Sequence, residues 1–222
     1  MNEAIGQSLP VAVGVLVSPM PIVAVVLMLT SRKAAANGTA FLLGWLVGIA
    51  AVGAVVLLAA GAATPSGDGP PSWVGVVKLV LGVLALLLAV TNWRKRPRQG
   101  TEPPTPRWMT AIDAFTPARS LGLGALLGAV NPKNLLLVVS GAAAIAGATS
   151  DSGAQAVALA VFVVVASLGV AAPIVLYVVL GSRAAPLLDD LKTWMVHNNA
   201  AILAVLLLVI GANLVGDGIS AL

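Results

Sequence analysis

The sequence predicts an all-α, polytopic membrane protein whose six transmembrane helices form two inverted three-helix repeats. Three observations carry this prediction. Of the 222 residues, 59% are hydrophobic and only 9% are charged, whereas a soluble domain usually carries about 25% charged residues. The apolar residues lie in six long runs without period-two alternation, which favours helices over strands. The first and fourth runs each contain a proline motif, and we predict that both helices break at mid-membrane.

The six expected spans follow one another along the whole chain. They cover residues 5–30, 38–61, 73–91, 119–148, 153–181 and 198–216. Each run is close to or above the roughly 20 residues that a helix needs to cross the hydrocarbon core of a bilayer. We therefore predict a multi-pass protein of the inner (plasma) membrane.

The basic residues predict the orientation of the spans. They follow the first, third and fifth spans, and are Arg32, Lys33, Arg94, Lys95, Arg96, Arg98, Arg107, Arg183 and Lys192. The other loops and the two ends contain no Lys or Arg. Because loops rich in Lys and Arg face the cytoplasm, both termini are predicted to be extracytoplasmic.

The chain divides around one linker. Residues 1–91 form the first predicted three-helix repeat, 92–118 a basic, Pro-rich cytoplasmic linker, and 119–222 the second repeat. An odd number of spans in each half makes the halves insert in opposite directions, so similar halves form an inverted repeat. The charge of the linker predicts contact with anionic membrane lipids.

Two proline motifs lie at matching positions in the first and fourth spans. They are Ser18-Pro19-Met20-Pro21 and Asn131-Pro132-Lys133-Asn134. Ser18 lies 13 residues from Ser31, and Asn131 lies 12 residues from Arg119, at the cytoplasmic ends of their spans. At about 1.5 Å per residue both motifs lie roughly 18–20 Å deep, near the bilayer midplane.

The chemistry of these motifs predicts an anion site. Proline is favoured at the first position of a helix, after a Ser or Asn cap, so we infer that each span restarts there. Each restart presents free N–H groups and a positive dipole end, and Lys133 adds a full charge. Such a site suits a phosphate or carboxylate. The alternative is that the prolines only kink the two helices.

Two further residues are included among the predicted substrate-binding residues. Lys78 lies five residues inside Trp73; it either extends to the outer surface or forms a second cationic group on the exit path. Asp113 precedes the fourth span and is a candidate partner for Arg119 or Lys133, or else a solvated cap.

Paired glycines predict close helix packing. Gly44 and Gly48 form one GxxxG face, and Gly124 and Gly128 form another. Such faces let two helix backbones approach closely, within one chain or between two copies. A homodimer is therefore a candidate assembly.

The composition argues against several other classes of function. The chain has no cysteine and one histidine, and lacks a Ser-His-Asp set in plausible register or paired carboxylates at depth. We predict no enzymatic activity, no catalytic residue, no cofactor, no metal site and no nucleic-acid partner. No GxxxxGK[ST] motif is present, so ATP does not drive the protein directly.

Several segments of the sequence resemble a known family. The segments SPMPIVAVVLMLTSRKAAANGTAFLLGWLVG, IDAFTPARSLGLGALLGAVNPKNLLL and HNNAAILAVLLL, and the Trp-Arg-Lys-Arg end of the third span, are similar to the actinobacterial GAP/Sap family of peptidoglycolipid- and sulfolipid-addressing proteins. That family belongs to the LysE exporter superfamily, whose first motif is usually Pro-Gly-Pro-like; here it is Pro19-Met20-Pro21. The resemblance implies six spans with inverted repeats and a role in moving envelope glycolipids to the cell surface.

Three functions follow from these observations. The first is an exporter or translocation factor for an anionic or amphipathic cell-envelope lipid or glycolipid, which rocks one half against the other. The second is a LysE-like exporter of a small organic anion or amino acid, which would use the same central site. The third is a non-transport scaffold that recruits lipid-synthesis machinery. A lateral opening between helices would favour a lipid, and a closed aqueous pocket a small solute.

Overall fold

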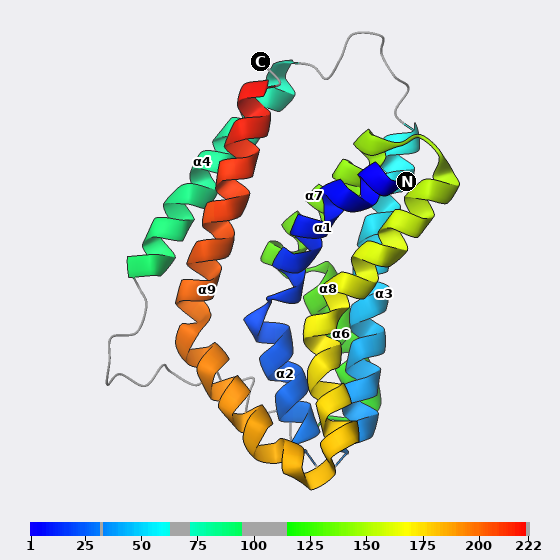
Figure 1. Ribbon diagram of the computed structural model, residues 1–222, viewed down its shortest axis with the longest axis vertical. Coiled ribbons are helices and arrows are strands. Elements are labelled where there is room, and N and C mark those ends of the chain that lie inside the picture. Colours follow the sequence, from blue (N-terminus) through cyan, green and yellow to red (C-terminus); the bar gives the residue numbers. More distant parts are fainter. Residues whose placement is uncertain (32, 63–71, 95–114, 221–222) are drawn as a thin grey trace. The chain divides into compact units, whose positions relative to one another are not determined.

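Every regular element of the described chain is a helix (Figure 1). The computed structural model describes residues 1–31, 33–62, 72–94 and 115–220. The helices are α1 (Asn2–Leu16), α2 (Pro19–Leu29), α3 (Ala34–Ala62), α4 (Ser72–Arg94), α6 (Pro117–Ala129), α7 (Pro132–Ala148), α8 (Ser152–Leu180) and α9 (Ala184–Ser220), with a 3-10 turn, η2 (Gly181–Arg183), between the last two. This confirms the predicted all-α class.

Several of these helices are long and apolar enough to span a membrane. α3, α8 and α9 each qualify alone, and the bent pairs α1–α2 and α6–α7 raise the number from three to five. The expected third span coincides with α4, whose apolar stretch Gly82–Arg94 is shorter than a span among the described residues. The chain is thus a multi-pass membrane protein, and the number six remains a prediction.

The first and fourth expected spans break at their proline motifs. α1 and α2 meet at an angle of 53°, and α6 and α7 at 60°. α2 begins at Pro19 directly after Ser18, and α7 begins at Pro132 directly after Asn131. Because proline lacks an N–H and clashes with the preceding turn, it ends the earlier helix and starts the next. The predicted breaks are confirmed; their depth in a membrane remains a prediction.

The chain forms two compact units. Unit 1 comprises Met1–Ala63 and Thr105–Thr193, and unit 2 comprises Thr64–Pro104 and Trp194–Leu222. Each unit therefore combines segments from both sides of the predicted linker. The division of the chain into two sequential repeats and a linker remains a prediction. Most of that linker, 95–114, lies outside the described residues.

In unit 1, the two GxxxG faces pack against each other, so that α3 and α6 run parallel with their backbones in close approach. A Cβ added to Gly48 would lie 2.6 Å from the carbonyl oxygen of Ala125, and one added to Gly128 would lie 3.0 Å from that of Trp45. A Cβ on Gly44 or Gly124 would likewise meet the opposing backbone. The glycines are thus used within the chain, and their faces are not available to a second copy.

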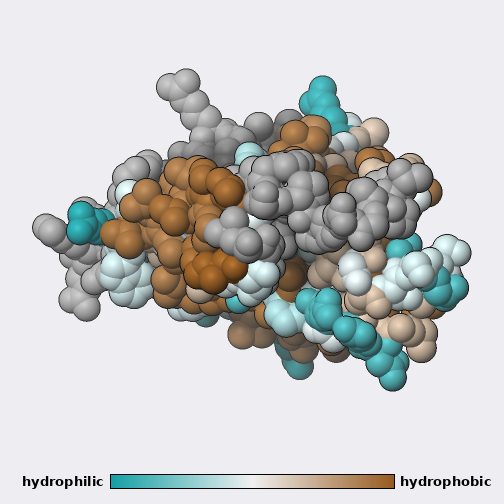
Figure 2. Space-filling model, turned by 90° about the horizontal axis from the view of Figure 1, so that it is seen from above, coloured by the Kyte–Doolittle hydropathy of each residue, from teal (hydrophilic) through white to brown (hydrophobic). Residues whose placement is uncertain are grey.

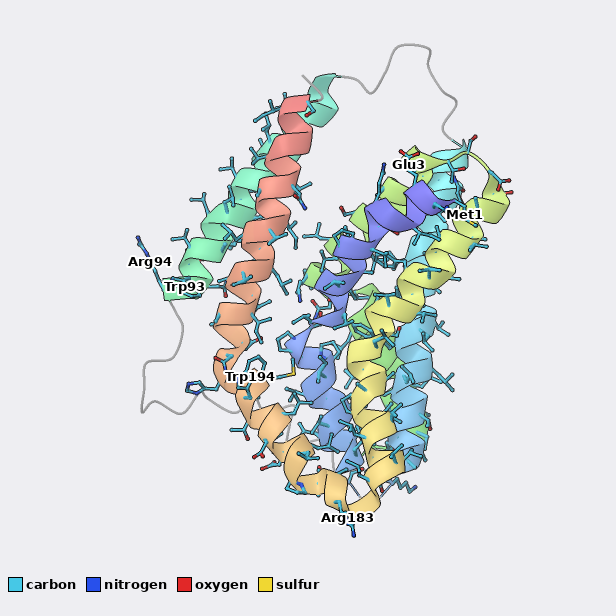
Figure 3. All side chains as sticks on the ribbon, in the orientation of Figure 1. Met1, Glu3, Trp93, Arg94, Arg183 and Trp194 are labelled. Atoms are coloured by element: carbon cyan, nitrogen blue, oxygen red, sulfur yellow. The ribbon has the colours of Figure 1, made fainter. Side chains whose placement is uncertain are left out.

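The remaining packing of unit 1 places three of its exposed basic residues at one end. α8 runs antiparallel to α3, because Gly38 lies against Ile174 while Gly53 lies against Leu159. The starts of α3 and α6 and the end of α8 therefore lie together, and there Lys33, Arg119 and Arg183 are exposed. In Figure 3 the labelled Arg183 and Glu3 lie at opposite ends of this unit.

Unit 2 is an antiparallel pair formed by α4 and the part of α9 that begins at Trp194. Its helices also approach through glycine: a Cβ on Gly211 would lie 2.9 Å from the carbonyl oxygen of Gly82, and one on Gly218 would lie 3.0 Å from that of Gly75. Many large apolar side chains of the pair stay exposed, among them Val80, Val83, Leu87, Leu88, Val205, Leu208 and Val209. Exposed apolar surface, extensive also in Figure 2, is typical of helices that face lipid.

The last helix is longer than the sequence analysis predicted. The expected span began at residue 198, but α9 begins at Ala184 and has 37 residues. Between Leu187 and Ile210 the sequence contains neither Pro nor Gly, so nothing interrupts the helix there. The polar segment before the span, including the ion pair of Lys192 with Asp189, therefore continues it as one helix.

Candidate functional site

The two helix breaks, far apart in the sequence, meet in unit 1. The hydroxyl of Ser18 donates a hydrogen bond to Oδ1 of Asn134 over 2.7 Å. Ser18 is 3% exposed and Asn134 is fully buried. Ser18 occupies the cap position of α2, but its side chain makes no bond to that helix. It joins the two breaks instead of capping its own helix.

Asn134 connects three segments. While its Oδ1 accepts from Ser18, its Nδ2 donates to the carbonyl oxygen of Leu127 over 3.0 Å. That carbonyl lies in the last turn of α6, where backbone acceptors have no partner within the helix. Asn134 thus ties the end of α6 and the break of the first span to the start of α7. Both the oxygen and the nitrogen of its amide are hydrogen-bonded. Asn134, which was predicted to bind substrate, therefore connects structural segments here.

Asn131 caps α7 as its sequence position predicted. Its Oδ1 accepts a hydrogen bond from the backbone N–H of Lys133 over 3.2 Å, and Pro132 occupies the first helical position. Its Nδ2 lies 3.9 Å from Sδ of Met20. Asn131 therefore fixes the start of α7 and also touches the other proline motif.

Lys133 reaches from the start of α7 to the end of α1. Its Nζ donates to the carbonyl oxygen of Val17 over 3.2 Å and to Oγ of Ser18 over 3.1 Å. Val17 caps the C-terminal end of α1, where free carbonyls carry a partial negative charge that a cation stabilises. No carboxylate within the described ranges forms an ion pair with Lys133.

The arrangement leaves Lys133 with unused binding capacity. An ammonium group has three N–H donors, and two acceptors are in place here. One donor and the whole positive charge remain for an anion. The helix N-termini add less than the sequence analysis expected, because Pro19, Pro21 and Pro132 carry no N–H. Met20 and Asn134 keep first-turn N–H groups.

The break lies partly at the surface. Met20 is 45% exposed and Val130 60% exposed. Pro132 is also exposed, and Asn131 and Lys133 are half-buried, whereas Pro19 and Pro21 are buried. The predicted residues thus separate into buried groups that join the helices and accessible groups around Lys133.

The other two predicted site residues are not brought to this place. Lys78 belongs to α4, in unit 2, and its side chain is outside the described part. Asp113 lies outside the described residues altogether. Among the residues that are described, no group of three His, Asp or Glu side chains could hold a metal ion.

Sequence reasoning missed three contributors to the site. Two are the backbone carbonyls of Val17 and Leu127, which accept from Lys133 and Asn134. The third is Gly169 in α8: a Cβ there would collide with the carbonyl oxygen of Leu16 and lie 3.2 Å from Ile22. Gly169 lets α8 pack directly on the broken end of α1. No small-residue pair at four-residue spacing marks Gly169 in the sequence, because Val165 and Pro173 stand at those positions.

Comparison with known proteins agrees with the resemblance found in the sequence. A family model described as "Sap, sulfolipid-1-addressing protein" matches residues 9–220. No curated protein and no solved structure matches the chain.

Proposed function

The chain belongs to the Sap, sulfolipid-1-addressing protein family, and from this we propose that it is a membrane exporter or translocation factor for an anionic or amphipathic cell-envelope lipid or glycolipid. The headgroup binds at the joined helix breaks, with Lys133 as its counter-ion. The family name supports a role in lipid addressing in a membrane; transport itself and the headgroup site are our proposal.

The observation that carries the proposal is the charge of Lys133. Its Nζ is held by a carbonyl and a hydroxyl, both neutral. A charged group within a membrane span is costly unless it faces a cavity or a partner of opposite charge. An anionic headgroup supplies that partner and uses the third N–H donor.

The exposure of the surrounding residues supports a lipid over a small solute. Met20 and Val130 beside the break are 45% and 60% exposed, so an apolar chain can lie against them while a headgroup reaches Lys133. A lipid that enters sideways keeps its acyl chains in the bilayer and brings only its polar part to the break. A small organic anion gains nothing from such a surface.

We further propose the full topology predicted from the sequence: six spans, inverted repeats as in the LysE superfamily, and both termini extracytoplasmic. The charges of unit 1 support it, since Lys33, Arg119 and Arg183 lie at one end and the labelled Glu3 lies at the other (Figure 3). In inverted-repeat transporters, one half rocks against the other around a fixed central site. The joined breaks are the natural position for that site.

The test compares lipids in a deletion strain that carries wild type, Lys133→Met, Lys192→Met or an empty vector. Lys192→Met is the matched control, because Lys192 is a lysine paired with Asp189 on the surface. We expect one lipid class to disappear from the cell surface with the empty vector and with Lys133→Met, at wild-type protein levels. Lys192→Met should restore it.

Two outcomes would overturn parts of the proposal. Full restoration by Lys133→Met would contradict the proposed headgroup site. It would favour the non-transport scaffold, which needs no charge at the break. Unchanged surface lipids in the empty-vector strain would exclude lipid addressing and favour a small-solute exporter.

A further inference from the structure

The first third of α9 is too polar to lie in the hydrocarbon core. The helix has 37 residues and is therefore about 55 Å long at 1.5 Å per residue, while the core is about 30 Å thick. Its uncharged apolar stretch covers residues 198–216. The preceding segment, 184–197, contains Asp189, Asp190, Lys192 and His197 and must lie outside the core.

The side chains of this segment form three separate stripes along the helix. Residues three or four positions apart share a face. The first stripe is buried against the protein: Ala184 and Leu188 are 0% and 1% exposed. The second stripe is apolar yet exposed, with Leu187 at 53%, Trp194 at 56% and Leu191 half-buried between them.

The third stripe is polar and lies on the opposite side of the helix from Ala184 and Leu188. It contains Asp189, Asp190, Thr193 and His197, all exposed. A helix in water would gain nothing from an exposed Leu–Leu–Trp stripe beside this polar one. A helix that lies in the headgroup region of a bilayer satisfies both stripes, because such helices bury an apolar face roughly 5–10 Å into the interface.

The cations around this segment fit a lipid surface, while Asp189 and Asp190 lie on the polar stripe that faces water. Arg183, directly before α9, is exposed, and it lies at the end of unit 1 that also carries the exposed Lys33 and Arg119. Cations at this end attract the phosphates of anionic lipids. Tryptophan is enriched at the membrane–water interface, which fits Trp194 at the point where α9 approaches its apolar stretch.

We propose that residues 184–197 form an amphipathic helix that lies in the headgroup region of the bilayer, with Leu187, Leu191 and Trp194 as the lipid-facing surface, so that α9 changes direction in the membrane between this segment and its apolar stretch 198–216. This surface is distinct from the helix breaks and does not depend on transport. It anchors the turn between α8 and α9 at a fixed depth in the membrane.

The absence of native cysteine makes the test direct. Single-cysteine variants at Leu187, Asp190, Thr193 and Trp194 are spin-labelled, and the protein is reconstituted in vesicles of phosphatidylglycerol and phosphatidylcholine. Collision with oxygen, which concentrates in lipid, is compared with collision with a water-soluble nickel chelate. We expect labels at 187 and 194 to favour oxygen at a depth of roughly 5–10 Å, and labels at 190 and 193 to favour the chelate.

Two control sites calibrate the experiment. Ala184→Cys reports a site that the protein covers, and Leu208→Cys reports an exposed site in the apolar stretch. Labels at 187 and 194 that meet the chelate as often as those at 190 and 193 would overturn the proposal. Labels at 187 and 194 that meet neither reagent, like that at 184, would also overturn it and indicate a protein partner or a second copy.

A second measurement needs no label. Subtracting the emission of Trp194→Phe from that of wild type isolates Trp194. That component should be quenched more by lipids brominated near the headgroup than by lipids brominated near the chain ends, and equal or absent quenching would contradict the proposal.

Discussion

Ser18 donates a 2.7 Å hydrogen bond to Asn134, although 116 positions separate them in the chain. Each residue lies at the break of a different span, and both are buried. The neighbouring Lys133 reaches back to the same hydroxyl over 3.1 Å. The two breaks are therefore joined by one cluster of hydrogen bonds, in which Lys133 and Asn134 from the start of α7 both contact Ser18.

Replacing Ser18 and Asn134 by alanine, singly and together, should reveal an interaction energy between them. Interhelical hydrogen bonds in membrane proteins contribute about 0.6 kcal/mol on average and up to roughly 1.7 kcal/mol, and we expect the upper part of this range because both side chains are buried. The free energy of unfolding, measured by titration with SDS in mixed micelles, gives the coupling. Effects that add to within about 0.3 kcal/mol would contradict it.

Gly124→Ala and Gly122→Ala should have opposite effects, although they lie in one helix. Alanine is the better helix former by about 1 kcal/mol at both sites. A Cβ at position 122 meets nothing within 4 Å, while at 124 it collides with the backbone of Phe41. We expect Gly122→Ala to be neutral or stabilising, and Gly124→Ala to lower the free energy of unfolding by about 1–3 kcal/mol. Equal effects would refute the close approach of α3 and α6.

Chemical rescue should separate the charge of Lys133 from its shape. Hydrogen bonds to charged groups contribute about 1.5–3 kcal/mol, so the purified Lys133→Cys variant should bind a fluorescent anionic lipid roughly 10- to 100-fold more weakly than wild type. Reaction with bromoethylamine creates an ammonium side chain of nearly native length and should restore binding. Iodoacetamide adds a neutral amide and should not. Restoration by both reagents would exclude a role for the charge.

Two aspartates should respond differently to the same replacement. Oδ2 of Asp151 accepts from the backbone N–H of Ala154 over 2.7 Å and caps α8, so Asp151→Ala should lower stability by about 1 kcal/mol. Asp189 pairs with Lys192 but its side chain is 63% exposed, and such surface pairs contribute less than about 1 kcal/mol. Asp189→Ala should therefore change the thermal midpoint less than Asp151→Ala; the reverse order would contradict both assignments.

The sequence was sufficient to place the helix breaks, because a Ser or Asn followed by proline is a local signal for the start of a helix. Proline alone was not sufficient, since Pro10 lies inside α1 and Pro173 inside α8 without a break. The cap formed by Asn131 is local in the same way, since its partner is the N–H of Lys133 two residues on.

The sequence could not predict which groups from distant segments form hydrogen bonds with the site residues. The charge of Lys133 indicated that it needs contacts, but its acceptor from the distant segment is the carbonyl of Val17, and backbone carbonyls have no sequence signature. Ser18 fitted a helix cap, yet a buried amide from another span takes its hydroxyl. The helix α9 begins well before its predicted span for a related reason: a run of high hydropathy marks where a helix enters the membrane, and says little of where the helix begins.

The parallel pairing of α3 with α6 has a consequence for how the protein is made. The ribosome completes α3, with the exposed groove around Gly44 and Gly48, before it synthesises α4 and the residues that precede α6. During that interval the groove faces lipid or an insertion chaperone, and any glycine-rich helix nearby can occupy it. A chain cut between α4 and α6 should consequently yield a short-lived N-terminal fragment that survives only when the C-terminal fragment is produced in the same membrane.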